Sequence, residues 1–284
     1  MPANDPRNAL RLQSRRALKA LLGRRIWTKL RAARIESHPT ERELKPSIAI
    51  VRRLASGVTI DVGANNGMYA IPIASSGARL VAFEANPVLC EWLRSELPDS
   101  VTVENFALAD GEGRVTLRIP IIAGREIPGM ATIAEANNFD DFEVEGTRHV
   151  EVPAISLDKY AADTLRSQAI TFVKVDVEGA EGRVLKGAHT ILQRDHPVLL
   201  VETEIRHGAD LAAIFADLAQ LDYRPYILAE FGDRLVPTNI DEVPRLQAAG
   251  NVPQPGRAAS PHYINNFFFV PTSRLPALCG LIST

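Results

Sequence analysis

Residues 61–67 read Asp61-Val62-Gly63-Ala64-Asn65-Asn66-Gly67 and follow a short apolar run at residues 58–60. A buried strand that leads through small residues into a helix brings its backbone close to a bound ligand. Glycine suits such a turn because a Cβ would block the approach or forbid the backbone angles. The stretch therefore predicts a strand, a ligand-binding turn and a helix, the first unit of a doubly wound α/β fold.

The turn differs from the dinucleotide fingerprint G-x-G-x-x-G, in which the first glycine makes the tight turn beside a pyrophosphate. Asp61 stands at that first position, so the pattern reads D-x-G-A-N-x-G. An acid at the strand end suits a ligand with a cationic amino group better than a pyrophosphate, because opposite charges attract. The pattern therefore favours S-adenosylmethionine (SAM) as cofactor, and NAD stays as the alternative.

A second acid lies at the end of the next apolar run. Residues 79–83 predict a strand, and Glu84 follows it, 21 residues after Gly63. An acid at this distance, on the tip of the second strand, is placed to accept both hydroxyls of a ribose. SAM and NAD both carry such a ribose, so Glu84 indicates a nucleoside ligand without separating the two cofactors.

The composition is ordinary for a globular protein with a sizeable core. Of 284 residues, 46% are hydrophobic and 23% are charged. The two cysteines, Cys90 and Cys279, have no metal-binding or redox spacing, which indicates reduced thiols in a cytosolic protein. The sequence has no apolar run long enough for a transmembrane helix and no apolar core of a secretory signal. We therefore expect a cytoplasmic protein.

Charge is spread unevenly along the chain. Residues 1–34 contain ten Lys or Arg and one acid, Asp5, a net charge of +9 against −2 for the whole chain. Apolar residues at helical spacing predict a helix over 8–35 and a second helix over about 40–55. Either the first helix packs on the domain, or residues 7–34 dock on an anionic surface such as the inner membrane leaflet or a lipid-linked glycan. No nucleic-acid partner is expected, because aromatic residues are not interleaved with the charge.

From residue 57 onward, strand and helix patterns alternate, which predicts a parallel sheet with helices on both faces. We expect strands at 58–62, 79–84, 101–106, 170–175, 197–203, 223–228 and 264–270. We expect helices at 67–76, 87–97, 156–166, 180–192 and 208–220. The apolar last strand fits a central place beside the sixth, which gives a doubly wound, seven-stranded, mostly parallel sheet. Two long irregular stretches, 120–148 and 230–263, are expected to select the substrate, and the first could roof the carboxyl ends of the strands.

A third constellation is Phe172-Val173-Lys174-Val175-Asp176-Val177-Glu178-Gly179-Ala180-Glu181. Lys174, Asp176 and Glu178 alternate along the predicted strand and so face the same side. An ion pair of Lys174 with a neighbouring carboxylate is expected, because a lysine in mid-strand is rarely buried unpaired. Asp176 falls at the carboxyl edge of a central strand, where the reactive end of a ligand should lie. We interpret Asp176 and Glu178 as candidates for catalysis or substrate binding.

Two further acids, Glu202 and Glu204, end the next predicted strand. Crowded carboxylates raise one another's pKa, which suits one of them for general-base duty. They could alternatively hold a divalent cation through oxygen ligands. No histidine or cysteine spacing supports a metal, so none is expected. His207 is a further candidate base.

These residues together resemble the FkbM family of SAM-dependent methyltransferases. The resemblance rests on Asp61-Val62-Gly63-Ala64-Asn65-Asn66-Gly67-Met68-Tyr69, Phe83-Glu84-Ala85-Asn86-Pro87, Asn105-Phe106-Ala107-Leu108 and residues 174–181. It covers about residues 57–205, with weaker support at 265–269, and Lys-x-Asp-Val-Glu-Gly-x-Glu is its specific part. Ala85 departs from the family, which commonly has proline there.

We expect a class I methyltransferase domain over residues 56–284, preceded by a basic helical extension at 1–55. The basic extension and the stretch 230–263 lie outside the resemblance. The resemblance implies SAM as cofactor and O-methylation, often of a hydroxyl on a sugar or natural product. Carried over by position, the residues that would surround the methionine end of SAM are Asp61, Gly63, Asn65 and Gly67. Glu84 would hold the ribose, and Asn105 and Ala107 would border the adenine. Lys174, Asp176 and Glu178 would lie near the methyl group.

An alcohol is a poor nucleophile while protonated, so a base near the acceptor oxygen helps methyl transfer. Our hypothesis is that Asp176 is the base or the hydroxyl-orienting group, with Glu178 and Lys174 as its partners. The acceptor would be a hydroxyl of a small molecule or of a glycan. Two alternatives remain at this point, an NAD-dependent oxidoreductase and a SAM-binding protein without catalytic activity.

Overall fold

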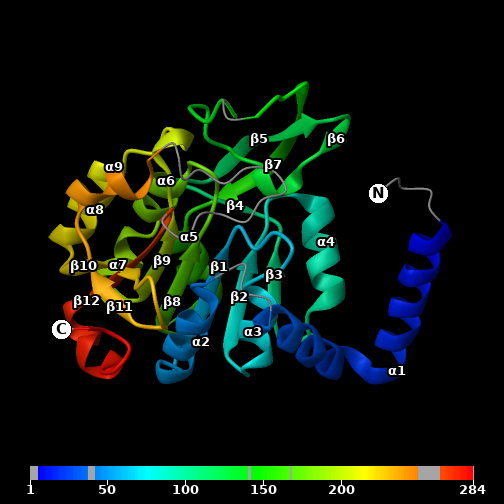
Figure 1. The fold of residues 1–284 in the computed structure, drawn as a ribbon, viewed down its shortest axis with the longest axis horizontal. Helices are drawn as coiled ribbons and strands as arrows, with labels where there is room; N and C mark the ends of the chain where they lie inside the picture. Colours follow the sequence, from blue (N-terminus) through cyan, green and yellow to red (C-terminus); the bar gives the residue numbers. More distant parts are fainter. Residues whose placement is uncertain (1–5, 38–41, 140–141, 167, 249–262, 284) are drawn as a thin grey trace.

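The computed structural model describes residues 6–37, 42–139, 142–166, 168–248 and 263–283, with the backbone alone for residues 6–16. Expectations about residues 1–5 and 249–262 lie outside the described residues. Two sheets form the framework, and Figure 1 shows the smaller one above the larger one. Among the described helices, none has the length and apolar character that crossing a lipid bilayer requires.

The large sheet is mixed, and six of its eight described strands run in one direction. In spatial order they are β11 (Leu235–Pro237), β10 (Tyr223–Leu228), β12 (Asn266–Pro271), β9 (Val198–Glu202), β8 (Ile170–Val175), β1 (Val58–Val62), β2 (Arg79–Phe83) and β3 (Thr102–Glu104). The predicted place of the last strand is confirmed, because β12 lies between β9 and β10 and is antiparallel to both.

The prediction of seven strands is wrong by one. Strand β11 lies inside the stretch 230–263 that was expected to be irregular, and it pairs antiparallel with the sheet edge through Leu228 and Leu235. Its three residues are too short a run to produce a periodic signal. The predicted strand 101–106 is also shorter than expected, since β3 ends at Glu104.

The small sheet was not predicted. In spatial order it consists of β4 (Ala107–Leu108), β7 (Gly146–Ile155), β5 (Gly113–Ile122) and β6 (Arg125–Glu126). Much of β5 and β7 is exposed, so these strands lack the continuous apolar run of a fully buried strand. Between β6 and β7, the described part of the stretch expected to be irregular contains a short 3₁₀ turn, η1 (Pro128–Met130), and an isolated bridge from Arg118 to Thr132.

Helices cover both faces of the large sheet. They are α1 (Pro6–Glu36), α2 (Leu44–Arg53), α3 (Ala70–Ser75), α4 (Pro87–Glu96), α5 (Leu157–Tyr160), α6 (Glu181–Lys186), α7 (His189–Asp195), α8 (Leu211–Gln220) and α9 (Val243–Leu246). The helix expected at 156–166 continues from α5 as a π-helical turn, η2 (Ala161–Leu165), and the helix expected at 180–192 is divided into α6 and α7. A Cβ at the break, Gly187, would overlap the Ala109 carbonyl oxygen, so glycine permits this close packing.

Apolar side chains form one core cluster on each face of the large sheet. Helices α5 to α9 pack in the first cluster, and α1 to α4 pack in the second. Alternation along β12 shows the arrangement, since Phe267 and Phe269 belong to the first cluster and Phe268 to the second. Phe215 of α8 makes edge-to-face contacts with Phe267 and Phe269, at centroid distances of 5.4 and 5.0 Å. The full burial of β12 on both faces matches its uninterrupted apolar sequence.

Helix α1 extends away from the rest of the molecule in its N-terminal half (Figure 1). It bends at Gly23, whose φ of 73° is not helical. Beyond the bend it packs on α4, because Glu96 accepts a hydrogen bond from Trp27 Nε1 at 2.9 Å and ion-pairs with Arg31 at 2.6 Å. Helix α2 contributes to the same core cluster as α3 and α4. The C-terminal part of α1 therefore packs on the domain, as the first of the two interpretations expects.

Candidate functional site

The glycine turn follows β1 and is closed by the chain that leaves β8. Gly63, Asn65 and Gly67 have φ values of 76°, 46° and 73°, all in the left-handed region. A Cβ on Gly63 would overlap the backbone carbonyl oxygen of Asp176. Gly63 is therefore needed for the close approach of the neighbouring strand end, whereas the sequence analysis attributed it to the approach of a ligand.

Asp61 lies inside β1 with its carboxylate turned into a cavity. Its side chain is buried, at 1% exposure, and neither carboxylate oxygen has a hydrogen-bond partner among the described residues. Burial raises the pKa of Asp61 to about 6. Lys174 and the Ala70 N–H lower this pKa, although the N–H does not have the geometry of a hydrogen bond to the carboxylate. A buried carboxylate without a donor is costly. The cavity therefore offers a place for a cationic group that donates hydrogen bonds.

Lys174 and Asp176 form the expected ion pair. Lys174 lies opposite Asp61 in the backbone register of β8 and β1. Its Nζ lies 2.7 Å from Asp176 Oδ2. The ammonium group also lies 4.7 Å from the centre of the Tyr69 ring. Burial would lower the pKa of Lys174, but the carboxylates of Asp176 and Asp61 raise it overall. Lys174 therefore holds its charge and keeps the Asp176 carboxylate in one position.

Glu84 is fixed by backbone donors at the tip of β2. Its Oε2 accepts the Asn65 N–H at 2.6 Å and its Oε1 accepts the Asn86 N–H at 2.8 Å. Burial raises the pKa of Glu84 to about 7, and these two N–H groups lower it. Each carboxylate oxygen retains a second lone-pair site that a hydroxyl could use. Asn105 does not line the cavity, because its amide donates to the carbonyl oxygens of Glu84 and Ala85, at 2.8 and 2.9 Å.

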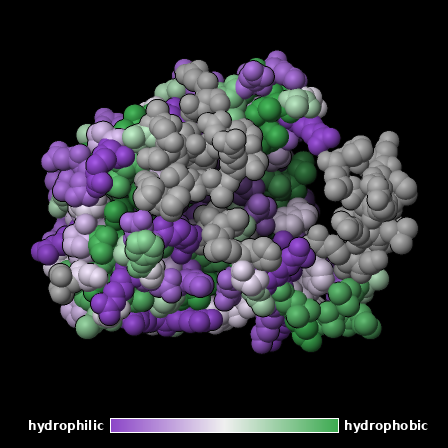
Figure 2. Space-filling model, in the orientation of Figure 1, coloured by the Kyte–Doolittle hydropathy of each residue, from purple (hydrophilic) through white to green (hydrophobic). Residues whose placement is uncertain are grey.

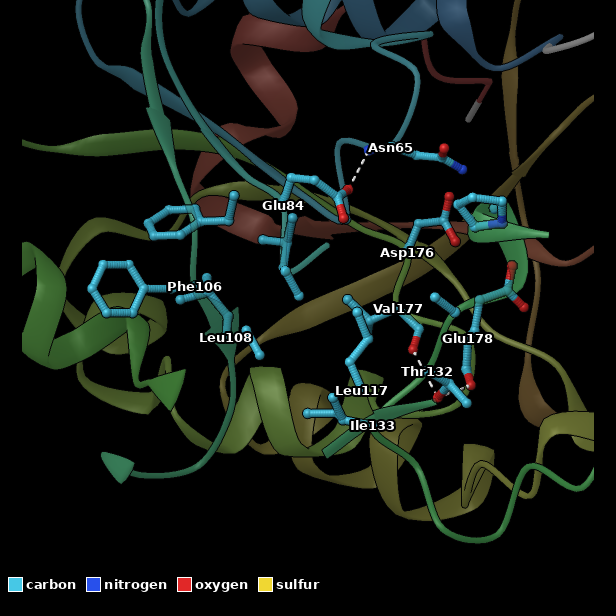
Figure 3. Close-up of a pocket in the computed structure, with 18 residues that line it drawn as sticks. Asn65, Glu84, Phe106, Leu108, Leu117, Thr132, Ile133, Asp176, Val177 and Glu178 are labelled. Atoms are coloured by element: carbon cyan, nitrogen blue, oxygen red, sulfur yellow. Dashed lines mark hydrogen bonds between the residues drawn. The ribbon is translucent and has the colours of Figure 1, made fainter. Parts of the chain in front are cut away.

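The main cavity lies between the glycine turn and the small sheet (Figure 3). It contains about 580 Å³ of empty space including its open mouth. Its apolar end is lined by Phe83, Ala85, Phe106, Ala107 and Leu108. Asp176 and Glu178 stand at the opposite end of the view from Phe106. The cavity therefore combines an apolar slot with carboxylates, one of which is Glu84.

The roof of this cavity comes from residues 128–133, within the stretch expected to roof the strand ends. Thr132 exchanges backbone hydrogen bonds with Arg118 of β5, at 2.8 and 3.0 Å. The Thr132 hydroxyl donates to the carbonyl oxygen of Glu178 at 2.7 Å (Figure 3). Asn137 Nδ2 donates to the same oxygen at 2.9 Å. The roof is thus joined both to the small sheet and to the turn that follows β8.

Two smaller cavities adjoin the main one. The first contains Asp61 and Lys174 and shares Gly63, Asn65 and Asp176 with the main cavity. The second shares Glu178 with the main cavity and contains Phe139, Phe142 and His207. His207 was predicted as a candidate base, whereas the two phenylalanines were not predicted, because they lie in a stretch without periodic pattern.

Glu202 and Glu204 do not behave as a crowded pair. Asn265 Nδ2 donates to both, at 2.8 and 3.1 Å, and Arg206 and Tyr263 each bond to Glu204. Burial would raise the pKa of Glu204, but Arg206 and Tyr263 lower it overall. The expectation that crowding raises the pKa of Glu204 is therefore wrong. Among the described residues, no group of three His, Cys, Asp or Glu side chains has the arrangement of a metal site.

The strand order, with β12 inserted beside β10, and the glycine turn after β1 define a Rossmann-like α/β fold of the class I methyltransferase type. The sequence profile of the methyltransferase FkbM domain matches residues 61–227, more than half of the chain. The protein therefore belongs to the FkbM methyltransferase family. A search of curated proteins found no match.

Solved structures that match this chain include the methyltransferase FkbM from Methylobacillus flagellatus KT, at 16% identity and a TM-score of 0.44. That match covers 76% of this chain and 44% of the other, so this chain spans less than half the length of that protein. Precorrin-6y C5,15-methyltransferase from Geobacter metallireducens GS-15 matches at 11% identity and a TM-score of 0.39, over 80% of this chain and 85% of the other.

Proposed function

We propose that the protein is a SAM-dependent O-methyltransferase whose acceptor is a hydroxyl of a sugar, in a glycan or glycolipid, or of a natural product. The observation that carries the proposal is the Asp61 carboxylate, buried without a hydrogen-bond donor in a cavity beside the glycine turn. An ammonium group such as that of the SAM methionine end would supply both charge and donors. A pyrophosphate would meet electrostatic repulsion there, which disfavours an NAD-dependent oxidoreductase.

The residues present fit the remaining parts of SAM as well. Glu84 has lone-pair sites for ribose hydroxyls, and the apolar slot around Phe106 and Ala107 suits a purine ring. Gly63, Asn65 and Gly67 shape the turn between these two sites. When bound, SAM supplies a methyl group activated by a positively charged sulfur. Asn105 supports the site from behind, by holding the backbone of Glu84 and Ala85.

The protein's own contribution is to orient the acceptor oxygen and to keep water out. Asp176, held by Lys174 at 2.7 Å, lies on the wall shared by the main cavity and the Asp61 cavity. From there its carboxylate can accept a hydrogen bond from an acceptor hydroxyl and fix its direction. The ion pair with Lys174 holds the Asp176 carboxylate in one position, which suits it for orienting the hydroxyl. The roof at residues 128–133 covers the same space.

Isothermal titration of the full chain with SAM, and with NAD as the comparison ligand, tests the proposal. We expect saturable SAM binding that weakens at least about a hundredfold in Asp61→Ala and about tenfold in Glu84→Gln, since each removes a charged hydrogen-bond partner. Asp217→Ala, an exposed position on α8, is the matched control and should bind as the unaltered protein does. Preference for NAD, or SAM binding indifferent to Asp61→Ala, would refute the proposal. A protein that binds SAM but transfers methyl to none of a broad set of hydroxyl acceptors would fit the non-catalytic alternative.

A further inference from the structure

The three cavities lie in a row along the carboxyl edge of the large sheet. Asp176 lines the first and the main cavity, and Glu178, two residues later, lines the main and the second cavity. The turn that follows β8 therefore contributes to the walls of all three cavities. The proposed function accounts for the Asp61 cavity and the main cavity, and it leaves the second without a ligand.

The second cavity has apolar rings and polar groups whose charges are paired. It contains about 340 Å³ of empty space including its mouth. Arg206 lies 5.8 Å from the centre of the Phe142 ring and is paired with Glu204, so its charge is balanced. Arg118, which is outside this cavity's wall, stacks on Phe139 at 5.5 Å. Ring faces beside balanced donors and acceptors suit a neutral ring that carries hydroxyl groups.

Two residues in the wall of the second cavity have a strained backbone. Seven described residues other than glycine have a positive φ, and among them are Glu178 at 54° and Phe139 at 59°. A bulky residue in this region is strained and persists where surrounding contacts enforce it. Thr132 and Asn137 enforce it at Glu178 by holding its carbonyl oxygen, at 2.7 and 2.9 Å. The second cavity is therefore a built feature with two strained residues in its wall.

Glu178 and His207 form a pair at the boundary with the main cavity. His207 Nε2 lies 3.4 Å from Glu178 Oε2, and both side chains are largely buried. Burial raises the pKa of Glu178 well above its usual range, with Asp176, Glu204 and Glu181 adding to the effect and Arg206 opposing it. Asp176, by contrast, is tied to Lys174. Glu178 stands on the boundary between the main and the second cavity and faces a histidine, so it is placed to accept a proton from a hydroxyl bound there.

We propose that the second cavity binds the acceptor as a hydroxylated six-membered ring stacked on Phe142, and that Glu178, positioned by His207, takes the proton of the reacting hydroxyl. This inference rests on the proposed function and names its acceptor site. The acceptor's O–H bond breaks and its proton passes to the Glu178 carboxylate. The oxygen's electron pair forms the new C–O bond, and the electron pair of the broken S–CH₃ bond stays on sulfur. The products are a methyl ether and a neutral thioether.

Saturation-transfer NMR on the full chain, with S-adenosylhomocysteine present, tests the ring site. The probes are the methyl α-pyranosides of glucose, mannose, rhamnose and fucose, with the open-chain polyol sorbitol as the matched ligand. We expect transfer to the ring protons of at least one glycoside and none to sorbitol. Phe142→Ala and the milder Phe142→Leu should raise the Kd of that glycoside about tenfold, whereas Val88→Ala, at an exposed apolar position on α4, should not. Absence of transfer to all four glycosides, or a signal that survives both Phe142 variants, overturns the inference.

Methyl transfer from labelled SAM to the bound glycoside tests the roles of Glu178 and His207. Glu178→Gln should lower kcat at least about a hundredfold, with Glu112→Gln as the exposed control. His207→Gln removes a partner that favours the charged form of Glu178, so the rising limb of kcat against pH should move to higher pH. His189→Gln, at an exposed histidine, should leave the profile in place. A His207→Gln profile that falls in height without moving would show a structural role only, and no transfer to any bound glycoside would refute the acceptor site.

SAM titration of the same variants separates this inference from the proposed function. If the unaltered protein does not bind SAM, the proposed function fails whatever the second cavity holds. If SAM binds normally and the Phe142 variants change nothing, only the acceptor site is wrong.

Discussion

Asp61 is the residue at which the proposed ligand binding and the stability of the folded protein oppose each other. Its carboxylate is buried in β1, and burial raises its pKa from 3.8 to about 6. A shift of about two units corresponds to roughly 3 kcal/mol of destabilisation of the charged form at neutral pH. The folded protein carries this cost in the absence of a ligand, and a bound cation would offset it.

Replacing this carboxylate should therefore stabilise the ligand-free protein. We expect Asp61→Asn to raise Tm at pH 7.5 by a few degrees, corresponding to about 1–3 kcal/mol, because a neutral amide costs less to bury than an unpaired charge. The same variant should lose SAM binding. Differential scanning calorimetry with and without SAM gives both results, with Asp217→Asn as the control. A lower Tm in Asp61→Asn would show that the charge contributes to folding through Lys174.

At the scale of the residue, the sequence predicted the location of a candidate residue where that location follows from its position along a strand. Asp61, Glu84 and Asp176 follow or end apolar strands, and the carboxyl ends of parallel strands meet at one edge. The Glu178–His207 contact could not be predicted from the sequence, because Glu178 lies beyond the end of β8 and has a positive φ. We expected Lys174, Asp176 and Glu178 to share a face because side chains alternate along an extended strand. The strand ends before Glu178, so this alternation does not apply to it.

At the scale of the element, the small sheet shows where pattern reading fails. Its strands β5 and β7 are half exposed, and their pairing joins residues such as Leu117 and Val150 that are distant in sequence. Neither feature leaves a periodic signal in either segment alone. The buried strands β1, β2 and β8 were predicted almost to the residue, because each is mostly apolar and lies between polar turns. The strands of the small sheet depend on tertiary contacts, which cannot be predicted from the sequence of one segment alone.

Helix α1 combines exposed apolar and basic side chains. Leu18 and Leu21 are exposed at its bend, and Figure 2 shows an apolar area in this region, at the lower right. Arg25 and Lys29 are also exposed, whereas Lys19 and Arg31 are bound to Glu96 on α4. Part of the basic charge is therefore used in packing and part faces solvent.

We expect α1 to bind vesicles that contain phosphatidylglycerol, and not vesicles of phosphatidylcholine alone. Each basic residue near an anionic surface contributes about 1 kcal/mol, so Arg25→Glu with Lys29→Glu should weaken sedimentation with vesicles more than about tenfold. Leu21→Ser should weaken it through lost apolar contact, and Phe231→Ser is the matched exposed control. Equal binding to both vesicle types, or no effect of the double variant, would leave α1 as a packing element only.

At the scale of the whole molecule, several buried carboxyls around the cavities have raised pKa values. Those of Asp61, Glu84 and Glu181 rise to about 6, 7 and 7, in each case mainly through burial. A group with a raised pKa in the folded state contributes stability below its ordinary pKa and loses it as pH rises through the folded value. Glu204, whose pKa is lowered, acts in the opposite sense below about pH 4.5.

The ligand-free protein should therefore become less stable between pH 5 and pH 7.5. We expect Tm to fall by several degrees over this range, since each carboxyl must ionise in a buried place. SAM should reduce the fall, because a cation beside Asp61 favours its charged form. Calorimetry in buffers of matched ionic strength measures this, and Asp61→Asn should show a smaller fall. A Tm that rises steadily through pH 7.5 would mean that these groups are solvated in solution.

The place of β12 has a consequence for how the chain is made. Residues are synthesised in order, yet β9 and β10 cannot assume their final spacing until Asn266–Pro271 has entered between them. A nascent chain that has emerged only through β11 exposes an unpaired edge on β9, beside aromatic and aliphatic side chains. During that interval the partly synthesised chain exposes surface that chaperones bind. Slower translation of the segment before Asn266 would lengthen the time during which the chain can aggregate.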